Sequence, residues 1–361
     1  MKKEEQIKNF DINGVLSKNG NLFALPFTYE TANIIVIPVP WDITTSNLAG
    51  TSNGPQAILD YSPQIDFYDF DVEDAWKLGI YLLPLNEKWI EQNEKLRPLS
   101  DQYIAALESP IESSSNDKRL LEKILHTINE ASLELKNDVY KKSSEIIEAG
   151  KIPFILGGEH SCPLGLIEAL LEKHSSFGIL QIDAHADLRN AYEGFTYSHA
   201  SIFYNAMQLS GISKLVSVGI RDICEEEIKF TKAHKDKIIP FYDHQLKKKM
   251  LVGNMNWQKW CIEIVNQLPQ KVYISFDIDG LSPELCPDTG TPVPGGLSYN
   301  EAIMLLKELI LQEKTIIGAD LSEVSVGSYP IINQSKEINA NIGARILYKL
   351  CNLTGRSNHL I

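Results

Sequence analysis

Residues 179–187 read Ile-Leu-Gln-Ile-Asp-Ala-His-Ala-Asp, a short apolar run that leads into two aspartates and a histidine. Further apolar runs occur along the chain at 34–37, 152–156, 214–218, 272–276 and 315–319. Runs of this length that are rich in β-branched residues are typical of strands covered on both faces. Helical stretches separate them, so the alternation predicts an α/β fold with a mainly parallel sheet between helices on both faces.

The same alternation bears on domain organisation. The longest helical stretch runs over 117–149, and Gly150 is its predicted C-terminal stop. The pattern continues across the polar stretch 107–118, which we therefore expect to be a surface loop and not a domain linker. Residues 1–32 are polar and weakly patterned, so we expect an N-terminal arm or lid there and one domain over 33–361.

Composition limits the partners and the compartment. The formal net charge of -13 argues against nucleic acid as the main partner and favours cationic substrates, although it also simply keeps a protein soluble. The five cysteines contain no Cys-x-x-Cys pair, so we expect a reducing compartment without disulfides or a cysteine zinc site. We see no signal segment and no run near the roughly 20 apolar residues of a membrane helix. A cytoplasmic protein that binds no membrane is the expectation.

Reactive side chains directly follow three of the predicted strands. His160 lies in a Gly-Gly-Glu-His-Ser segment after the run 152–156. Asp277 and Asp279 lie in an Asp-Ile-Asp segment after the run 272–276. Ligands of open parallel sheets bind outside the carboxyl ends of the strands, so we expect these segments to meet at one edge. If the backbone stays extended beyond each strand, alternate side chains point the same way and converge.

These segments supply ligands of metal-binding type. The six candidates are His160, Asp183, His185, Asp187, Asp277 and Asp279. Such a set exceeds the four Cys- or His-rich ligands of a structural zinc and suits two harder ions, such as Mn²⁺. Two adjacent cations lower the pKa of a shared water, so hydrolysis needs no side-chain nucleophile. The chain also lacks a Gly-x-Ser-x-Gly elbow and a recognisable phosphate loop. For Glu323, which follows 315–319, the pattern leaves a surface acid and a site residue equally open.

The order and spacing of these motifs resemble those of the ureohydrolase family, which contains arginases and agmatinases. The matching segments are GGEHS (157–161), DAHADLR (183–189), SFDIDGLSP (275–283) and TGTPVPGGL (289–297). The resemblance runs from about residue 34 to the C-terminus. It implies the family's arginase-like fold, a single three-layer α/β/α domain, with 33–361 as the catalytic domain. It also implies a homo-oligomer, commonly a trimer or hexamer.

The resemblance further implies roles for individual residues. One divalent cation would be held by His160, Asp183, Asp187 and Asp277, and the other by Asp183, His185, Asp277 and Asp279. Mn²⁺ is the first expectation for both, with Ni²⁺ or Co²⁺ as alternatives. Asp279 would also orient the metal-bound hydroxide, and Glu323 would pair with the guanidinium. His199 lies where many members place a histidine that carries a proton to the leaving amine.

The implied reaction is hydrolysis of a guanidino C–N bond with release of urea. Arginases place an asparagine where this chain has Arg189, so L-arginine is disfavoured, and the segment around His199 is closer to the agmatinase-like branch. Agmatine or another small cationic guanidino compound is the expected substrate. Free guanidine and a formimidoylglutamate-type amidine are alternatives. Trp41 and the polar loop 44–47, as well as the N-terminal arm, could close a small pocket.

Two rival interpretations remain at this point. A zinc-dependent deacetylase can share the fold, but it needs one metal and leaves the extra carboxylates unexplained. A metal-binding paralogue without activity is the non-enzyme alternative, and the presence of His199 and Glu323 argues against it. Bound metal per chain and urea release separate these classes from a working ureohydrolase.

Overall fold

An eight-stranded sheet forms the centre of the computed structural model, which describes residues 1–17, 20–108, 115–327, 329–330 and 337–361. The strand order is β2-β1-β3-β8-β7-β4-β5-β6, and all pairs of neighbours are parallel. The strands are β1 Ile34–Val39, β2 Ile80–Leu82, β3 Ile152–Gly157, β4 Phe177–Ile182, β5 Ile212–Val218, β6 Ile238–Phe241, β7 Lys271–Asp277 and β8 Thr315–Ser322.

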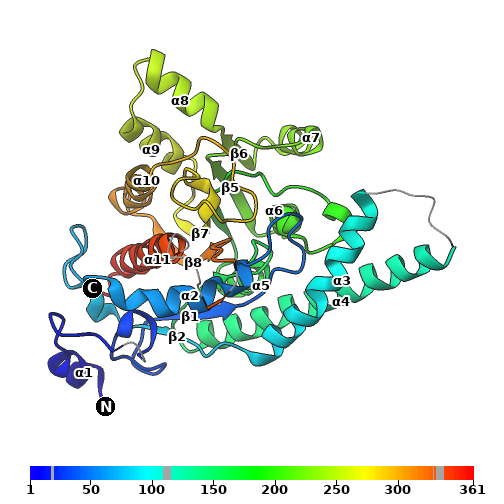
Figure 1. Ribbon diagram of the computed structural model, residues 1–361. Coiled ribbons are helices and arrows are strands. Elements are labelled where there is room, and N and C mark those ends of the chain that lie inside the picture. Colours follow the sequence, from blue (N-terminus) through cyan, green and yellow to red (C-terminus); the bar gives the residue numbers. More distant parts are fainter. Residues whose placement is uncertain (18–19, 109–114, 328, 331–336) are drawn as a thin grey trace.

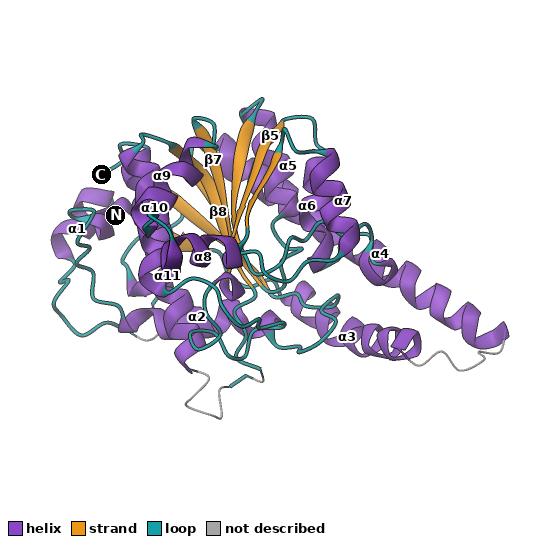
Figure 2. Ribbon diagram, turned by 90° about the horizontal axis from the view of Figure 1, so that it is seen from above, coloured by secondary structure: helices purple, strands orange, loops and turns teal. Residues whose placement is uncertain are grey.

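Helices cover both faces of this sheet (Figure 1). They are α1 Lys3–Asn9, α2 Gly54–Tyr61, α3 Glu87–Glu108, α4 Ser115–Glu148, α5 Leu164–Lys173, α6 Ile202–Met207, α7 Glu225–Ala233, α8 Asp243–Val252, α9 Trp257–Asn266, α10 Tyr299–Leu311 and α11 Glu337–Ser357. Figure 2 shows α9, α10 and α11 on one side of the strands and α4, α5 and α6 on the other. The predicted single α/β domain with a parallel sheet is confirmed.

The six predicted strands are all present, and two edge strands were not predicted. β2 has only three residues, and β6 contains a proline and has only one buried residue, so neither forms a recognisable apolar run. The inner strand β4 is buried at all six positions, because helices cover both of its faces. The long helix predicted at 117–149 is α4, and Gly150 follows it with a φ of 74°.

The prediction for residues 107–118 needs a correction. Helix α3 continues to Glu108, and α4 begins at Ser115 with Asp117 in its first turn, where the helix dipole favours an acid. The predicted loop is therefore shorter, and its remaining residues 109–114 lie outside the described part of the chain.

The N-terminal segment 1–32 packs against the body of the protein. Phe23 is fully buried, and its ring lies 5.0 Å from that of Tyr348 in α11. The Gln6 amide of α1 donates a hydrogen bond to the carbonyl of Pro26. The division into an arm or lid and a catalytic domain over 33–361 stays a prediction. Among the described helices, none combines the length and the apolar character that crossing a membrane requires.

Candidate active site

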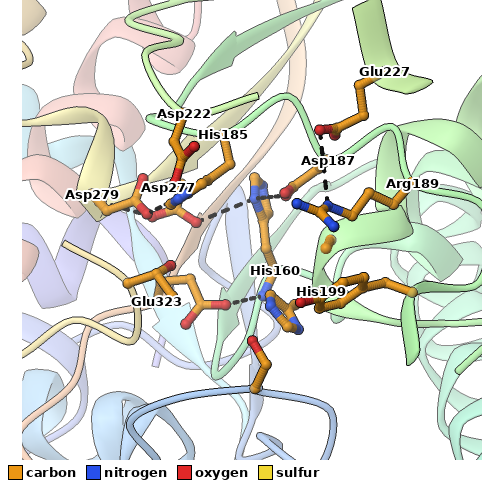
Figure 3. A pocket seen from close by; sticks show the side chains of 14 residues that line it. His160, His185, Asp187, Arg189, His199, Asp222, Glu227, Asp277, Asp279 and Glu323 are labelled. Atoms are coloured by element: carbon orange, nitrogen blue, oxygen red, sulfur yellow. Dashed lines mark hydrogen bonds and ion pairs between the residues drawn. The ribbon is translucent and has the colours of Figure 1, made fainter. Parts of the chain in front are cut away.

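The polar pocket of this fold lies at the carboxyl ends of the central strands (Figure 3). His160 follows β3, Asp277 ends β7, and Glu323 follows β8. His185 and Asp187 come from the segment after β4. All five side chains line the pocket, so residues far apart in sequence meet at the edge expected for a parallel sheet.

His160 lies at the centre of a group of buried carboxylates. Its Nδ1 is 3.1 Å from Asp183 Oδ2, 3.0 Å from Asp187 Oδ2 and 3.3 Å from Asp277 Oδ2. The four side chains are almost completely buried. The ligand atoms of His160, Asp183 and Asp277 lie within 4.8 Å of one another, which is the spacing of a metal site.

A second group lies beside the first and shares Asp183 with it. His185 Nδ1 is 3.0 Å from Asp279 Oδ2 and 3.8 Å from Asp183 Oδ1. The ligand atoms of Asp183, His185 and Asp279 again lie within 4.8 Å of one another. The two oxygens of Asp183 therefore face different histidines, as a carboxylate between two cations does.

The electrostatics of the two groups fit divalent cations. Burial and then repulsion from Asp183 raise the pKa of Asp187 to about 7. Burial and then repulsion from Asp279 raise the pKa of Asp277 well above its usual range. His160 Nδ1 is buried and faces these acids at 3.0–3.3 Å, without a well-aligned hydrogen bond to any of them in the described structure. Buried carboxylates this close to one another are costly unless cations lie between them, and the oxygen and nitrogen donors suit Mn²⁺-type ions.

An extended backbone is not what brings these ligands together. Asp187 has a left-handed φ of 54°, so the predicted alternation does not continue through it. Asp279 lies in a 3₁₀ turn over Ile278–Gly280, in which its backbone N–H donates to Asp277 Oδ1 at 2.8 Å. The convergence that was expected from alternation comes from two tight turns instead.

Close backbone approaches hold these turns in place. A Cβ on Gly280 would lie 2.7 Å from the backbone nitrogen of Asp183, so the two ligand-bearing turns can touch only with glycine there. Arg221 Nη2 donates to the carbonyls of Asp279 at 2.7 Å and Val293 at 2.9 Å. This guanidinium joins the 278–280 turn to the proline-rich loop, a role that the sequence did not predict.

Polar residues behind His160 were also missed. Its Nε2 lies 2.9 Å from Ser275 Oγ and 3.8 Å from Asp320 Oδ1, and Tyr273 donates to Asp320 Oδ2 at 2.6 Å. Such partners orient a metal-binding histidine. A signal existed in the sequence, because Tyr273, Ser275 and Asp320 are polar residues at inner positions of apolar strands.

The structure places Glu323 inside the pocket and not on the surface. Its Oε1 accepts a hydrogen bond from the backbone N–H of His160 at 2.8 Å. Its Oε2 is buried and has no hydrogen-bond partner in the described structure. Burial and then the charge of Glu159 raise the pKa of Glu323 well above its usual range. A buried carboxylate oxygen in this position is suited to a cationic donor.

His199 lies on the same pocket wall (Figure 3). Its backbone N–H donates to Thr44 Oγ1 at 3.0 Å, and its Nδ1 lies 3.4 Å from both Thr44 Oγ1 and Ser198 Oγ. Burial and then the positive charge of His185 lower the pKa of His199 to about 3. The ring is therefore neutral near pH 7.

Charged and aromatic side chains form the rest of the wall. The guanidinium of Arg189 lies 4.4 Å from the centre of the Tyr192 ring, and its Nε is 3.9 Å from Glu227 Oε2. Asp222 lines the same pocket and is exposed. Of the predicted closing residues, Ser46 lines the pocket, whereas Trp41 is fully buried and packs edge-on against Trp89. No described residue of 1–32 is among the lining residues.

Residues 32–352 match the sequence profile of the Arginase family. The curated relatives include an N(1)-aminopropylagmatine ureohydrolase of Synechocystis sp., which is 29% identical, with 91% of this chain and 92% of the relative covered. An enzyme of the same name from Thermus thermophilus is 31% identical, covering 82% of this chain and 84% of the relative. The agmatinase of Bacillus subtilis is 27% identical, with 89% and 92% covered.

Solved structures resemble the fold. An agmatine ureohydrolase of Thermoplasma volcanium has a TM-score of 0.68 at 24% identity and covers 99% of both chains. The arginase of Bacillus caldovelox has a TM-score of 0.62 at 21% identity, with 90% of this chain and 98% of that chain covered. These likenesses extend over the sheet and both helical layers. The relatives by sequence are ureohydrolases, which disfavours both the deacetylase and the inactive paralogue.

Proposed function

This chain belongs to the Arginase family, and from that premise we propose that it cleaves its guanidino substrate between two divalent cations and Glu323. That it is an agmatinase-like ureohydrolase acting on guanidino compounds follows from the family and the relatives. The residue roles, the two cations and the particular substrate are the proposal. The observation that carries it is the sharing of Asp183 by two adjacent groups of metal-binding side chains.

Six side chains would hold the two cations. They are His160, Asp183, His185, Asp187, Asp277 and Asp279. When bound, such a pair lowers the pKa of a shared water and so supplies a nucleophile near neutral pH. Mn²⁺ is the first candidate, and Ni²⁺ and Co²⁺ accept similar oxygen and nitrogen donors.

Asp279 is the residue that we propose to orient the attacking water. Burial would raise its pKa, but the charge of His185 outweighs burial and holds the pKa below its usual range. Its carboxylate therefore stays ionised and accepts hydrogen bonds. One oxygen, Oδ1, accepts from the backbone N–H of Ala184 at 3.0 Å, which fixes the side chain.

Glu323 would bind the guanidinium of the substrate. Glu323 lines the pocket with Oε2 unpartnered, whereas Oε1 is held by the backbone of His160. Pairing of a carboxylate with a guanidinium is strong and directional, so it would place the guanidinium carbon over the two groups of ligands. Neutral His199 would accept a proton from the attacking water and deliver it to the leaving nitrogen.

We propose a cationic chain, as in agmatine or its N(1)-aminopropyl derivative, for the rest of the substrate. The curated relatives include enzymes named for both compounds. Asp222 at the exposed part of the pocket attracts a distal ammonium. Arg189 would favour a carboxylate, but Glu227 and the Tyr192 ring already engage its guanidinium. A trimer or hexamer and a cytoplasmic location remain proposals as well.

A urea-release screen tests the proposal. The substrates are agmatine, N(1)-aminopropylagmatine, guanidinobutyrate, guanidine and L-arginine, each with Mn²⁺ and with Ni²⁺. We expect the highest kcat/KM for one of the first two and the lowest for L-arginine. Higher turnover of guanidinobutyrate would contradict the cationic chain and assign Arg189 to a substrate carboxylate. Absence of urea with every compound, at two bound cations per chain, would end the proposal.

A further inference from the structure

Glu159 is a fully buried carboxylate beside the active site that the proposed chemistry does not use. Thr44 donates to it twice, from its backbone N–H to Oε2 at 2.8 Å and from its hydroxyl to Oε1 at 2.8 Å. Ser161 Oγ donates to the same Oε1 at 2.6 Å. Three donors converge on this one carboxylate, so both of its oxygens act as acceptors.

The Thr44 hydroxyl connects this carboxylate to His199. A hydroxyl carries one proton, and Thr44 gives that proton to Glu159. Its oxygen can then offer only lone pairs to His199, whose backbone N–H it accepts at 3.0 Å. The same oxygen lies 3.4 Å from His199 Nδ1. An acceptor that faces Nδ1 stabilises the neutral ring with its proton on Nδ1.

Ser198 provides a second oxygen beside the same nitrogen. Its Oγ lies 3.4 Å from His199 Nδ1 and accepts from the backbone N–H of Ala200 at 3.2 Å. A proton on Nδ1 can be shared between the Thr44 and Ser198 oxygens. The opposite tautomer would leave a lone pair of Nδ1 facing the lone pairs of Thr44, which is repulsive, and only the Ser198 hydroxyl could donate to that nitrogen.

We propose that Glu159 and Thr44 are positioning residues that fix the tautomer of His199, with the proton on Nδ1 and the lone pair of Nε2 free for proton transfer. The inference rests on the proposed function of His199 as the proton carrier. The role is similar in logic to that of the carboxylate in a catalytic triad, but a threonine hydroxyl lies between the carboxylate and the imidazole.

The proton balance of this arrangement closes over one turnover. Nε2 takes a proton from the attacking water, which makes an imidazolium with both nitrogens protonated. The positive ring then lies next to the Thr44 oxygen, whose hydroxyl is polarised by the Glu159 carboxylate. Nε2 passes the same proton to the leaving nitrogen, and the Nδ1-protonated neutral ring returns. No net proton stays on the protein, and no electrons are transferred.

Thr44→Val tests the inference, because it replaces the hydroxyl with a methyl of similar size. Thr44→Ser keeps the hydroxyl and serves as the conservative variant. The matched control is Thr51→Val, since Thr51 is equally buried and its hydroxyl has no hydrogen-bond partner among the described residues. Glu159→Gln is a second route to the same effect, because an amide has one oxygen and cannot accept both bonds from Thr44.

The first readout is the tautomer itself. The chain, labelled with ¹⁵N-histidine and loaded with diamagnetic Zn²⁺, is examined by NMR at pH 7.5, and the signals of His199 are assigned with His199→Gln. We expect Nδ1 to be protonated in the wild type, in Thr44→Ser and in Thr51→Val, and a shift toward Nε2 protonation in Thr44→Val and Glu159→Gln. Protonation at Nε2 in the wild type, or an unchanged tautomer in Thr44→Val, would overturn the inference.

The second readout is a double-mutant cycle on urea release. Thr44→Val should lower kcat by roughly 10-fold or more, with little change in KM, and by no more than the about 10²- to 10⁴-fold that a proton-transferring group contributes in full. In a His199→Gln background the same substitution should have no further effect. An equal loss in both backgrounds would assign Thr44 a structural role only. If no guanidino compound is hydrolysed, the proposed function fails, while the NMR result still decides the tautomer.

Discussion

Asp183 occupies a position that no other described residue shares, because it belongs to both groups of metal-binding side chains. Its Oδ2 is 3.1 Å from His160 Nδ1, and Gln181 Nε2 donates to the same oxygen at 2.9 Å. Its Oδ1 accepts from the backbone N–H of His185 at 2.7 Å. Hydrogen bonds therefore hold both oxygens of this carboxylate in place.

Asp183→Asn should therefore remove metal and activity together. The asparagine keeps the size of the side chain but loses the negative charge between the two cations. We expect a loss of metal affinity above the roughly 10- to 100-fold that changes behind the ligands cost. Metal analysis after dialysis, together with urea release, measures both effects. Asp222→Asn is the control and should retain two cations; full metal content in Asp183→Asn would contradict the bridging role.

Glu323→Gln should separate substrate binding from metal binding. The substitution removes a charge-assisted hydrogen bond of about 1.5–3 kcal/mol, so kcat/KM should fall roughly 10- to 100-fold. The metal content should stay the same, because Glu323 accepts from the backbone N–H of His160 and is not one of the proposed ligands. Steady-state kinetics and metal analysis of the same sample check this. Wild-type kinetics would discard the guanidinium-binding role.

At the scale of elements, the C-terminal end of helix α5 carries a histidine whose protonation depends on its surroundings. Helix α5 begins after the His160 segment, packs against α4 and ends at Lys173, with His174 as its C-terminal cap. A protonated histidine at a helix C-terminus is usually favourable. Here burial, and then the charges of Lys271 and Lys173, lower the pKa of His174 to about 4. Its Nδ1 is buried without a hydrogen-bond partner in the described structure.

His174 should therefore make α5 and its surroundings sensitive to acid. In the unfolded chain the residue binds a proton below pH of about 6.5, whereas the folded chain takes it up only near pH 4. The unfolded state binds more protons in this window, so the free energy of unfolding falls as the pH falls through it. His174→Gln should weaken this fall. Thermal unfolding of both proteins from pH 7 to pH 4 measures the difference, and parallel curves would contradict the assignment.

At the scale of the whole molecule, the proposed cation site should link the stability of the fold to pH and to metal. Without cations, burial would lower the pKa of His185, but the charge of Asp279 outweighs it and raises the pKa to about 10. The folded metal-free chain therefore holds a proton that the unfolded chain loses above pH of about 6.5. Its stability must fall as the pH rises from 7 toward 10.

Removal of metal by a chelator should thus lower the melting temperature and make it fall between pH 7 and pH 9. Added Mn²⁺ should raise the melting temperature, because binding at a hundredfold excess over Kd stabilises the folded state by about 3 kcal/mol. It should also make the melting temperature depend less on pH, because the cation replaces the proton on His185. Thermal unfolding with and without Mn²⁺ tests this. Asp183→Asn is the comparison, since its melting temperature should respond little to Mn²⁺. Equal melting curves of chelated and loaded wild type would contradict the two-cation site.

Local sequence was sufficient for the inner sheet and for the acids and histidines at its edge. The run 179–182 is apolar at nearly every position because both of its faces are covered, and that signal needs no knowledge of distant residues. The ligand candidates were found in the same way, since Asp183 and Asp277 lie at or directly after strand ends. The edge strands β2 and β6 were missed, because β2 has only three residues and β6 is interrupted by a proline and buried at one position only.

The three-dimensional arrangement alone decided the contacts between these segments. Asp187 reaches the site through a left-handed turn, and Arg221 ties the 278–280 turn to a loop far along the chain. Glu159 and His199 are connected through Thr44, which precedes Glu159 by 115 residues. Periodicity along one segment reports which face of that segment is buried, but it carries no information about which distant side chain occupies the space opposite. Hydrogen bonds between remote segments therefore become visible only when the sheet has assembled.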